Sequence, residues 1–271
     1  MLLDGKSLAN EIYLELHKYK HKFAVILVGN NENSKLYVKM KKNRCSKMNI
    51  DAIIYNYDEN INIKEIINKI MSLNNDPEIK GIMVQLPLPK LIRKYTREIL
   101  DTIDHTKDVD GLTSHSMGKL ALNDSSCFKS CTPLGIIEML QRYNIKIEGE
   151  NVVIIGKSQI VGMPLSLMFS NLDATVTLCH IKTKNLKTIT NTADILVVCC
   201  GDPQFIKKDY IKTGATIIDV GINIIYDYEG NKKVVGDVDF EDIKEKAGAI
   251  TPVPGGVGPM TICMLIKQIL Q

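Results

Sequence analysis

The segment Val152-Val-Ile-Ile-Gly156-Lys-Ser158-Gln-Ile-Val-Gly162-Met-Pro164 decides the fold of the second half of the chain. Its apolar run predicts a buried parallel strand, and the glycines that follow predict a tight turn into a helix. Backbone amides at a helix N-terminus attract anions, and glycine lets a diphosphate approach closely. The segment predicts a dinucleotide site. Ser158 interrupts the usual G-x-G-x-x-G spacing, so glycines that serve only the turn are the alternative.

Further apolar runs on both sides of this segment predict two parallel sheets. In the first half, strands are expected at residues 23–28, 52–57 and 81–86. In the second half, they are expected at 152–155, 174–178, 195–200 and 215–220. Helical segments alternate with them, at 8–19, 31–48, 61–73, 91–103 and, last, 260–270. This alternation predicts an α/β fold with two domains, an N-terminal parallel-sheet domain and a Rossmann-like NAD(P)-binding domain.

A polar stretch at residues 111–130 contains few helix signals, and we expect it to join the two halves. Thr132-Pro133 then predicts the start of a helix. Thr132 is expected as its N-cap and Pro133 as its first helical residue.

The bulk composition excludes several classes of protein. With 34 basic and 31 acidic residues, the net charge of +3 indicates neither nucleic acid nor a membrane surface as a partner. No apolar run is long enough to span a membrane, and the N-terminus lacks a signal-peptide pattern.

Seven cysteines at irregular spacings, without a Cys-x-x-Cys pair, argue against a metal site. Free thiols in this number are typical of a reducing compartment, so we expect a cytoplasmic protein. Cys199 and Cys200 lie in an apolar run and are expected to be buried.

The end of the strand at 174–178 carries information about the dinucleotide. A NAD site usually places an acid there to bind the ribose hydroxyls. Here the sequence is Cys179-His180-Ile181-Lys182-Thr183-Lys184, which contains no acid. Together with Lys157, these side chains favour NADP over NAD. His180 is expected to satisfy local hydrogen bonds and not to act as a catalytic base.

Four polar residues of the first half form a candidate catalytic group. Tyr37 and Lys41, with Ser34, are spaced to share one helical face. Gln85 precedes Leu-Pro-Leu-Pro at the carboxyl end of a parallel strand, where such sheets bind ligands. Asp110 stands beside Gly111 in a turn. Each residue alone is more typical of a structural or solvated position.

Taken together, these motifs resemble the bifunctional methylenetetrahydrofolate dehydrogenase/cyclohydrolase family. The matching segments run through the whole chain, at 34–41, 81–89, 107–111, 131–133, 156–164, 221–223, 235–238 and 251–261. The last, Thr251-Pro-Val-Pro-Gly-Gly-Val-Gly-Pro-Met-Thr261, is the most specific. The resemblance implies a catalytic, folate-binding domain at 1–120, completed by a C-terminal helix at 258–271. It also implies a nucleotide-binding domain at 121–257, an active site in the cleft between the domains, and a homodimer.

The resemblance also implies the chemistry. The family oxidises methylenetetrahydrofolate by hydride transfer to NADP, and water then attacks the methenyl cation to give formyltetrahydrofolate. Lys41 would accept and return the proton, since burial and the adjacent cation would both disfavour its charged form. Gln85 would orient Lys41, Asp110 would accept hydrogen bonds from the pterin edge, and Tyr37 would stack on the folate.

The residues that the resemblance implies fall into two groups. The folate contacts would be Tyr37, Lys41, Val84, Gln85, Leu86, Asp110, Pro254, Gly255, Gly256, Val257 and Gly258. The dinucleotide contacts would be Thr132, Gly156, Lys157, Ser158, Ile181 and Ile222.

Two positions depart from the family pattern. Lys157 stands where Arg is common, and Lys lacks the planar, bidentate grip of Arg on a phosphate. Ile181 stands where many members have Ser or Arg at the adenosine ribose. Both changes weaken the expectation of NADP and leave NAD as the alternative.

Two other functions share this architecture. One is an NAD(P)-dependent oxidoreductase of another small substrate, and the other is a non-enzymatic nucleotide-binding sensor. The joint presence of Tyr37, Lys41, Gln85 and Asp110 counts against both.

Overall fold

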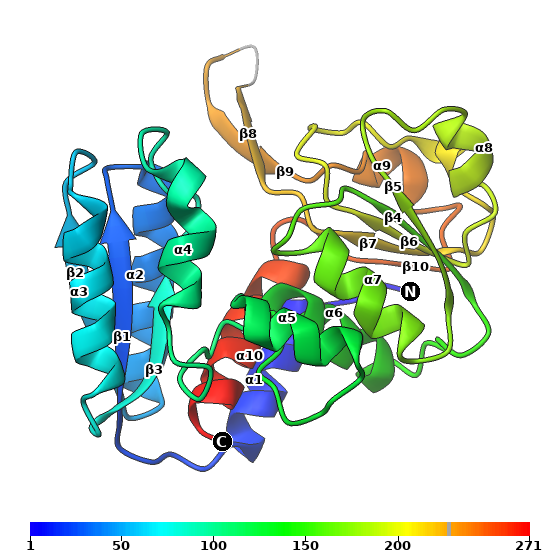
Figure 1. The fold of residues 1–271 in the computed structure, drawn as a ribbon. Helices are drawn as coiled ribbons and strands as arrows, with labels where there is room; N and C mark the ends of the chain where they lie inside the picture. The colour runs from blue at the N-terminus through cyan, green and yellow to red at the C-terminus, as the bar shows by residue number, and fades with distance from the viewer. Residues whose placement is uncertain (227–228) are drawn as a thin grey trace. The chain divides into compact units, whose positions relative to one another are not determined.

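The computed structural model describes residues 1–226 and 229–271 (Figure 1). The chain forms two compact units. The three-stranded unit comprises Tyr13–Lys129 and Met264–Gln271, and the five-stranded unit comprises Met1–Ile12 and Ser130–Cys263. Two helices contribute residues to both units, α1 (Gly5–Glu15) and α10 (Val257–Ile269).

The sheet of the three-stranded unit is parallel, in the order β2-β1-β3. Its strands are β1 (His21–Val28), β2 (Ile50–Tyr57) and β3 (Ile79–Val84). The central strand β1 is buried from Phe23 onward, as its continuous apolar run predicts for a strand covered on both faces.

The helices of this unit follow its strands, and three of them begin at side-chain caps. They are α2 (Glu32–Lys47), α3 (Ile63–Asn74), the 3-10 turn η1 (Arg93–Tyr95), α4 (Thr96–Asp101) and α5 (Ser114–Ala121). Asn31, Asn62 and Thr113 cap α2, α3 and α5 by accepting backbone N–H bonds. The expectation of few helices at 111–130 is wrong for α5, because the Thr113 side chain accepts from Ser116 N and begins a helix within that polar stretch.

The five-stranded sheet is also parallel, in the order β10-β7-β6-β4-β5. Its strands are β4 (Asn151–Ile155), β5 (Thr175–Cys179), β6 (Ile195–Val198), β7 (Thr216–Asp219) and β10 (Ala249–Ile250). After β4 the chain adds β5 on one side and β6 on the other. This reversal at β4 is the switch point beside which sheets of this kind bind nucleotides, at the carboxyl ends of the strands.

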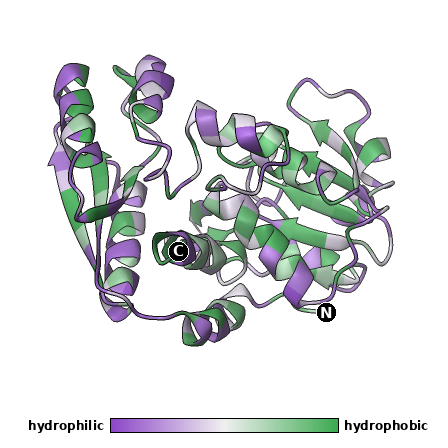
Figure 2. Ribbon diagram, turned by 60° about the horizontal axis from the view of Figure 1, so that its bottom comes forward, coloured by the Kyte–Doolittle hydropathy of each residue, from purple (hydrophilic) through white to green (hydrophobic). Residues whose placement is uncertain are grey.

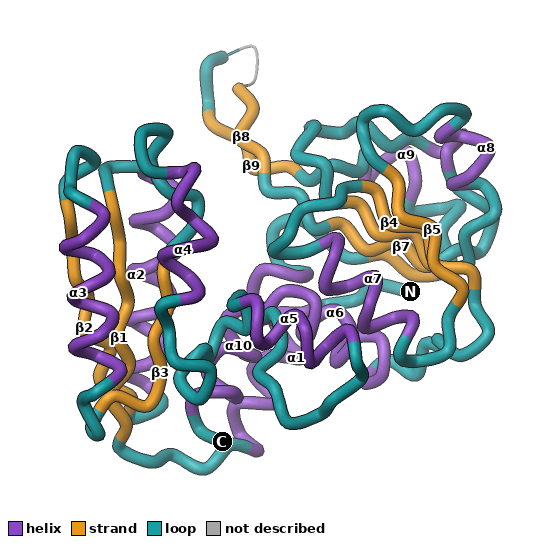
Figure 3. Tube along the Cα trace, viewed as in Figure 1, coloured by secondary structure: helices purple, strands orange, loops and turns teal. Residues whose placement is uncertain are grey.

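The remaining elements of this unit are mostly short. They are α6 (Cys131–Arg142), α7 (Gly162–Ser170), α8 (Leu186–Thr190), η2 (Lys208–Tyr210), α9 (Phe240–Ile243) and the antiparallel hairpin β8 (Asn223–Tyr226) and β9 (Lys232–Val235). Figure 3 shows the hairpin extending away from the five-stranded sheet.

Two local expectations are corrected in this unit. The N-cap of α6 is Ser130, so Thr132 is already helical. The strand expected at 195–200 ends at Val198, and Cys200 is exposed while Cys199 is only half-buried.

Each unit has its own apolar core. Figure 2 shows hydrophobic residues along the strands of the five-stranded sheet and mixed polarity on its helices. In the three-stranded unit, Ile26, Ile70 and Ile82 are fully buried in one cluster. Among the residues that the structure describes, no helix is long and apolar enough to cross a membrane.

The core contribution of α3 gives a first prediction. Ile70 is 0% exposed, whereas its neighbour Met71 is 52% exposed. Ile70→Ala should lower the free energy of unfolding by about 2–5 kcal/mol, because it removes buried methylenes and leaves a cavity. Met71→Ala, the matched control, should change it by less than about 0.5 kcal/mol. Urea unfolding followed by circular dichroism measures both, and equal effects would contradict the assigned packing.

Candidate active site

The helix α2 presents a row of polar side chains toward the interior of its unit. Ser34, Lys41 and Cys45 are buried on one face, and Tyr37 is half-buried on the same side. Burial raises the pKa of the Tyr37 hydroxyl. Burial also raises the pKa of the Cys45 thiol to about 12, although the nearby charge of Lys41 acts in the opposite direction. The helical spacing seen in the sequence therefore does bring these residues to one face.

Lys41 and Gln85 are in direct contact. The Lys41 side chain is 7% exposed, and its Nζ donates a hydrogen bond to Gln85 Oε1 at 3.0 Å. Nζ also lies 3.3 Å from Met83 Sδ. Gln85 Nε2 donates to the Leu86 carbonyl at 2.8 Å, which turns the amide oxygen toward the lysine. The pair joins α2 to the carboxyl end of β3, where the chain leaves the sheet.

The segment that carries Asp110 is anchored along β3. Ile82 N donates to the Lys107 carbonyl at 2.8 Å, which continues the sheet pairing. Val109 packs against Gly81, where an added Cβ atom would lie 2.6 Å from Val109 Cγ1. Asp110 follows this contact and is half-buried. The structure thus places Asp110 in the same unit as Lys41 and Gln85, on the segment next to β3.

Asp108 is a structural residue that the sequence reasoning missed. It is buried and accepts hydrogen bonds from Leu112 N, Thr113 N and Ser116 Oγ at 2.7–3.2 Å. Burial raises the pKa of this carboxyl, and the hydrogen bonds oppose the shift. An acid followed by Thr113-x-x-Ser116 is the sequence signal that could have found it, since such residues cap helices.

The turn after β4 is closed by two glycines. Gly156 has a φ of +118°, and a Cβ atom added to it would lie 2.3 Å from the Cys199 carbonyl oxygen. A Cβ atom added to Gly162 would lie 1.8 Å from the Gly156 carbonyl oxygen. The Ser130 hydroxyl donates to the Ile160 carbonyl at 2.8 Å. Glycine is therefore required at both ends of the turn.

The same turn exposes polar side chains, and the Ser158 hydroxyl accepts a hydrogen bond from Val161 N at 3.2 Å within it. Lys157 and Ser158 are exposed, and the turn leads directly into the first residues of α7. Glycine backbone at Gly156 and Gly162, at the start of a helix and with the exposed Lys157 beside it, fits the diphosphate of a dinucleotide.

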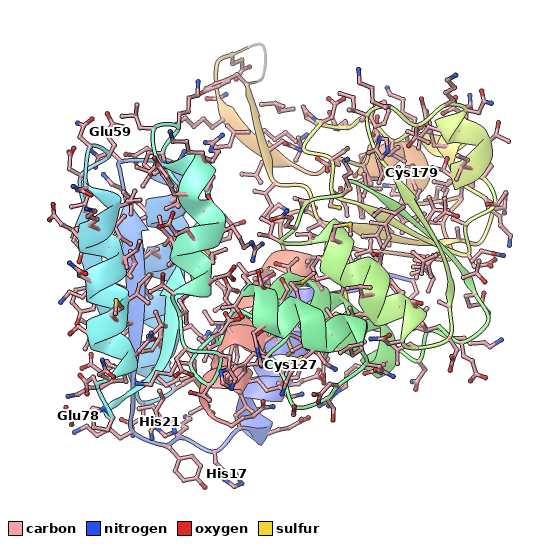
Figure 4. All side chains as sticks on the ribbon, viewed as in Figure 1. His17, His21, Glu59, Glu78, Cys127 and Cys179 are labelled. Carbon is pink, nitrogen blue, oxygen red and sulfur yellow. The ribbon has the colours of Figure 1, made fainter. Side chains whose placement is uncertain are left out.

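The end of β5 lies beside this turn. Gly156 N donates to the Cys179 carbonyl at 2.9 Å, and Figure 4 labels Cys179. Ile181 is 97% exposed. His180 Nδ1 accepts from Lys182 N at 3.1 Å, and the Thr183 hydroxyl accepts from His180 N at 2.8 Å. The expectation that His180 satisfies local hydrogen bonds is confirmed, and the Thr183 hydroxyl is used within the loop.

Ile222, which is expected at the dinucleotide, lies close to Gly258, which is expected at the folate, and the helix that contains Gly258 also contacts Thr132. The Thr132 and Thr261 hydroxyls are 2.9 Å apart. Ile222 Cδ1 lies 3.8 Å from where a Cβ atom on Gly258 would stand. Gly255 has a φ of +113°, which glycine tolerates. The glycine-rich turn of Pro254–Gly258 thus lies next to Ile222.

Among residues 1–226 and 229–271, no three His, Cys, Asp or Glu side chains are placed to hold a metal ion. The candidate groups are a buried lysine with its amide partner and a glycine-closed turn at a sheet switch point. They define a two-domain α/β protein of the dinucleotide-dependent enzyme class.

Comparison with known proteins identifies the family. The model of the tetrahydrofolate dehydrogenase/cyclohydrolase catalytic domain matches residues 3–110, and that of the corresponding NAD(P)-binding domain matches residues 130–271. The chain belongs to the tetrahydrofolate dehydrogenase/cyclohydrolase family. The resemblance seen in the motifs is therefore confirmed, as is the α/β class with a NAD(P)-binding domain.

Individual relatives agree with this assignment. The bifunctional protein FolD of Thermodesulfovibrio yellowstonii is 47% identical, over 98% of this chain and 94% of that protein. The crystal structure of the FolD methylenetetrahydrofolate dehydrogenase/cyclohydrolase of Campylobacter jejuni is 44% identical, with a TM-score of 0.94, and 100% of this chain and 97% of that one are covered. The Trypanosoma brucei enzyme complexed with NADP and an inhibitor is 32% identical, with a TM-score of 0.93 and coverages of 100% and 96%.

The closed turn yields the second prediction. Gly162→Ala should lower the free energy of unfolding by about 1–3 kcal/mol, because the added methyl group meets backbone that cannot move aside. Gly118→Ala is the control, since Gly118 lies in α5 with no atom within 4 Å of an added Cβ. That change should be neutral or stabilise by up to about 1 kcal/mol. A Gly162→Ala variant as stable as the parent in thermal unfolding would refute the close approach.

Proposed function

We propose that this chain oxidises methylenetetrahydrofolate with NADP and then hydrolyses the methenyl product to formyltetrahydrofolate. The observation that carries the proposal is the buried Lys41–Gln85 pair, at 3.0 Å. A lysine removed from water and held by an amide oxygen is suited to exchange a proton with a substrate. Membership of the family supports both reactions.

The oxidation depends on placement more than on acid–base catalysis. When bound, the nicotinamide supplies the acceptor for the hydride. Gly156, Lys157 and Ser158 would hold the diphosphate, and Thr132, Ile181 and Ile222 would contact the rest of the dinucleotide. The domain at 121–257 would thus bind the cofactor, and the domain at 1–120, with the helix at 258–271, the folate.

The hydrolysis needs a group that accepts a proton and later returns it. Water adds to the methenyl carbon and loses a proton to the Lys41 amine. The bond from that carbon to one ring nitrogen then breaks as the formyl C=O bond forms. The nitrogen receives the proton held by Lys41, and the hydroxyl proton is released to solvent as the net proton of the reaction. Gln85 would keep Nζ in place through both transfers, because its own amide is fixed by the Leu86 carbonyl.

The remaining residues would orient the folate. Asp110 would accept hydrogen bonds from the donors on the pterin edge, and Tyr37 would stack on the aromatic system. Val84 and Leu86 flank Gln85 and would shape the floor of the site. The glycines from Pro254 to Gly258 would let the backbone approach the ligand closely.

NADP is the proposed cofactor, with NAD as the alternative. Lys157 is exposed at the turn and offers a positive charge to a phosphate. The Trypanosoma brucei relative is complexed with NADP. Ile181 offers no hydrogen bond to a ribose phosphate, which weakens the preference.

Initial rates with methylenetetrahydrofolate and either NADP or NAD test the proposal directly. A faster reaction with NADP, and loss of methenyl absorbance on hydrolysis, are the expected results. A purified protein that performs neither reaction would overturn the proposed function.

The role of Lys41 yields the third prediction. Lys41→Met should reduce the hydrolysis rate by about 100-fold or more, which is the usual contribution of a general acid–base group. Lys42→Met changes an exposed lysine one position along α2 and should leave the rate within about twofold. Absorbance of the methenyl compound measures both rates, and circular dichroism checks folding. Hydrolysis retained in Lys41→Met would contradict the role.

A cytoplasmic homodimer is proposed in addition. All seven cysteines are free thiols, which is typical of a reducing compartment. The hairpin β8–β9 exposes Ile224, Tyr226 and Val234, and Ile224 is paired directly with Val234. Such an apolar surface on a hairpin suits a symmetric contact with a second copy of the chain.

The hairpin surface yields the fourth prediction. Ile224→Asp should halve the molar mass measured by sedimentation, because a charge would be buried in the contact. Leu122→Asp, at an exposed apolar residue elsewhere, serves as the control. A parent protein that sediments as a monomer, or an Ile224→Asp variant that remains dimeric, would reject this interface.

A further inference from the structure

Two buried carboxylates lie together at the carboxyl end of the five-stranded sheet, and neither has a role in the site described above. Asp219 is the last residue of β7 and is 3% exposed. Asp237 follows β9 and is 0% exposed. Burying two acidic side chains next to each other costs free energy. The groups that bind them therefore indicate which parts of the chain they hold in place.

The carboxylate of Asp219 accepts three backbone hydrogen bonds. Oδ1 accepts from Gly221 N at 3.0 Å and from Asp237 N at 2.9 Å, and Oδ2 accepts from Val238 N at 2.9 Å. Both oxygens therefore face donors whose positions the main chain sets. This carboxylate joins the loop after β7 to the segment that follows β9.

The carboxylate of Asp237 extends the network to two further segments. Oδ2 accepts from Cys200 N at 2.8 Å and from Gly201 N at 2.9 Å, in the loop after β6. Oδ1 accepts from Asn223 Nδ2 at 2.8 Å. The two acids together hold the loops after β6 and β7 and the base of the β8–β9 hairpin.

Two glycines make room for the pair. A Cβ atom on Gly221 would lie 2.2 Å from Asp237 Oδ1, and one on Gly236 would lie 1.8 Å from Asp219 Oδ2. The segments Gly221-Ile-Asn223 and Val235-Gly-Asp-Val238 are therefore two halves of one arrangement. Gly221 of the first segment faces the Asp237 carboxylate, and Gly236 of the second segment faces the Asp219 carboxylate.

The network borders the residues expected to bind the dinucleotide. Ile222 lies between Gly221 and Asn223. Gly221 N donates a hydrogen bond to the Asp219 carboxylate, and Asn223 Nδ2 donates one to the Asp237 carboxylate. The loop after β6 includes Cys199, whose carbonyl oxygen packs against Gly156. Displacement of either loop would move Ile222 or the phosphate-binding turn.

Ionisation of Asp219 costs the fold free energy. Burial, with a smaller contribution from the charge of Asp237, raises the pKa of Asp219 to about 7, against the opposing backbone hydrogen bonds. A carboxyl whose pKa is raised on folding contributes stability below its unfolded pKa of about 3.9 and loses that contribution as the pH rises through about 7.

We propose that Asp219 and Asp237 are positioning residues for the dinucleotide, which hold Ile222 and the Gly156 turn in the arrangement that binds it. They act through the loops and touch neither substrate nor cofactor. This inference rests on the proposed function, since it assumes that these loops bind NADP or NAD.

Asp219→Asn tests the role most directly. The amide of Asn keeps one acceptor, but its Nδ2 would face either Val238 N–H or both Gly221 N–H and Asp237 N–H, and backbone amides cannot turn away. The Kd for NADPH, measured by fluorescence titration, and the KM for NADP should both rise about tenfold or more. Hydrolysis of the methenyl compound, which needs no dinucleotide, should stay within about twofold and shows that the chain is folded.

A nearby acid serves as the control. Asp239 caps α9 by accepting from Asp242 N, and Asn caps a helix equally well. Asp239→Asn should therefore leave the Kd for NADPH unchanged.

A second pair of variants decides the matter if Asp219→Asn does not fold. Asp237→Asn should raise the Kd for NADPH, because a neutral amide oxygen is a weaker acceptor for Cys200 N and Gly201 N. Adding Asn223→Asp places a carboxylate opposite the introduced amide across the 2.8 Å contact. This stronger bond to the introduced Nδ2 should hold the remaining oxygen toward Cys200 N and Gly201 N, and so recover part of the affinity. Rescue by the transposed pair supports positioning, and its absence counts against it.

The possible failures are distinguishable. A parent protein that binds neither NADPH nor NADH overturns the proposed function itself. A parent that binds NADPH, with a folded Asp219→Asn variant of equal affinity, overturns only the positioning role. A variant that loses dinucleotide binding and hydrolysis to the same extent also overturns it, because the damage would then be general.

Discussion

Burial of the central strands on both faces is the constraint on which the rest of the structure depends. β1 and β6 are apolar throughout their inner parts and have hydrogen-bonded neighbours on both sides. Such strands leave no place for polar side chains except at their ends. Parallel strands bring all carboxyl ends to one edge of the sheet, so the polar groups of each unit gather at that edge.

The polar groups that do enter the interior are matched to partners. Lys41 enters from α2 and meets Gln85 at the end of β3. Asp108 binds the amides that begin α5, and Asp219 and Asp237 bind the loops after β6 and β7. Each of these groups costs free energy when it leaves water, and hydrogen bonds offset part of that cost. These hydrogen bonds hold the loops around the site in defined positions.

Glycine serves the same end by allowing close approach. Gly156 and Gly162 close the turn after β4, and Gly221 and Gly236 face the buried carboxylates. A methyl group at any of these four positions would collide with backbone or with a carboxylate. The fine geometry of the nucleotide-binding domain is therefore set by contacts that sequence patterns show only as isolated glycines.

The sequence by itself determined the α/β class, the strands β1 to β7 and the family, because apolar runs and motif spacing are local properties. It did not indicate the strands β8, β9 and β10, which are short. It misjudged the helix α5, which a side-chain bond of Thr113 begins, and the burial of Cys200, which lies beyond the end of β6. It also placed the N-cap of α6 at Thr132, whereas the helix begins after Ser130. The family resemblance implied that Gln85 orients Lys41, and the tertiary structure supplied the contact itself, Lys41 Nζ to Gln85 Oε1 at 3.0 Å between residues 44 apart in the chain. Only the tertiary structure showed that Asp219 and Asp237 lie together, with Asp237 N donating to the Asp219 carboxylate. Contacts between distant segments follow from packing and leave no periodic signal in the sequence.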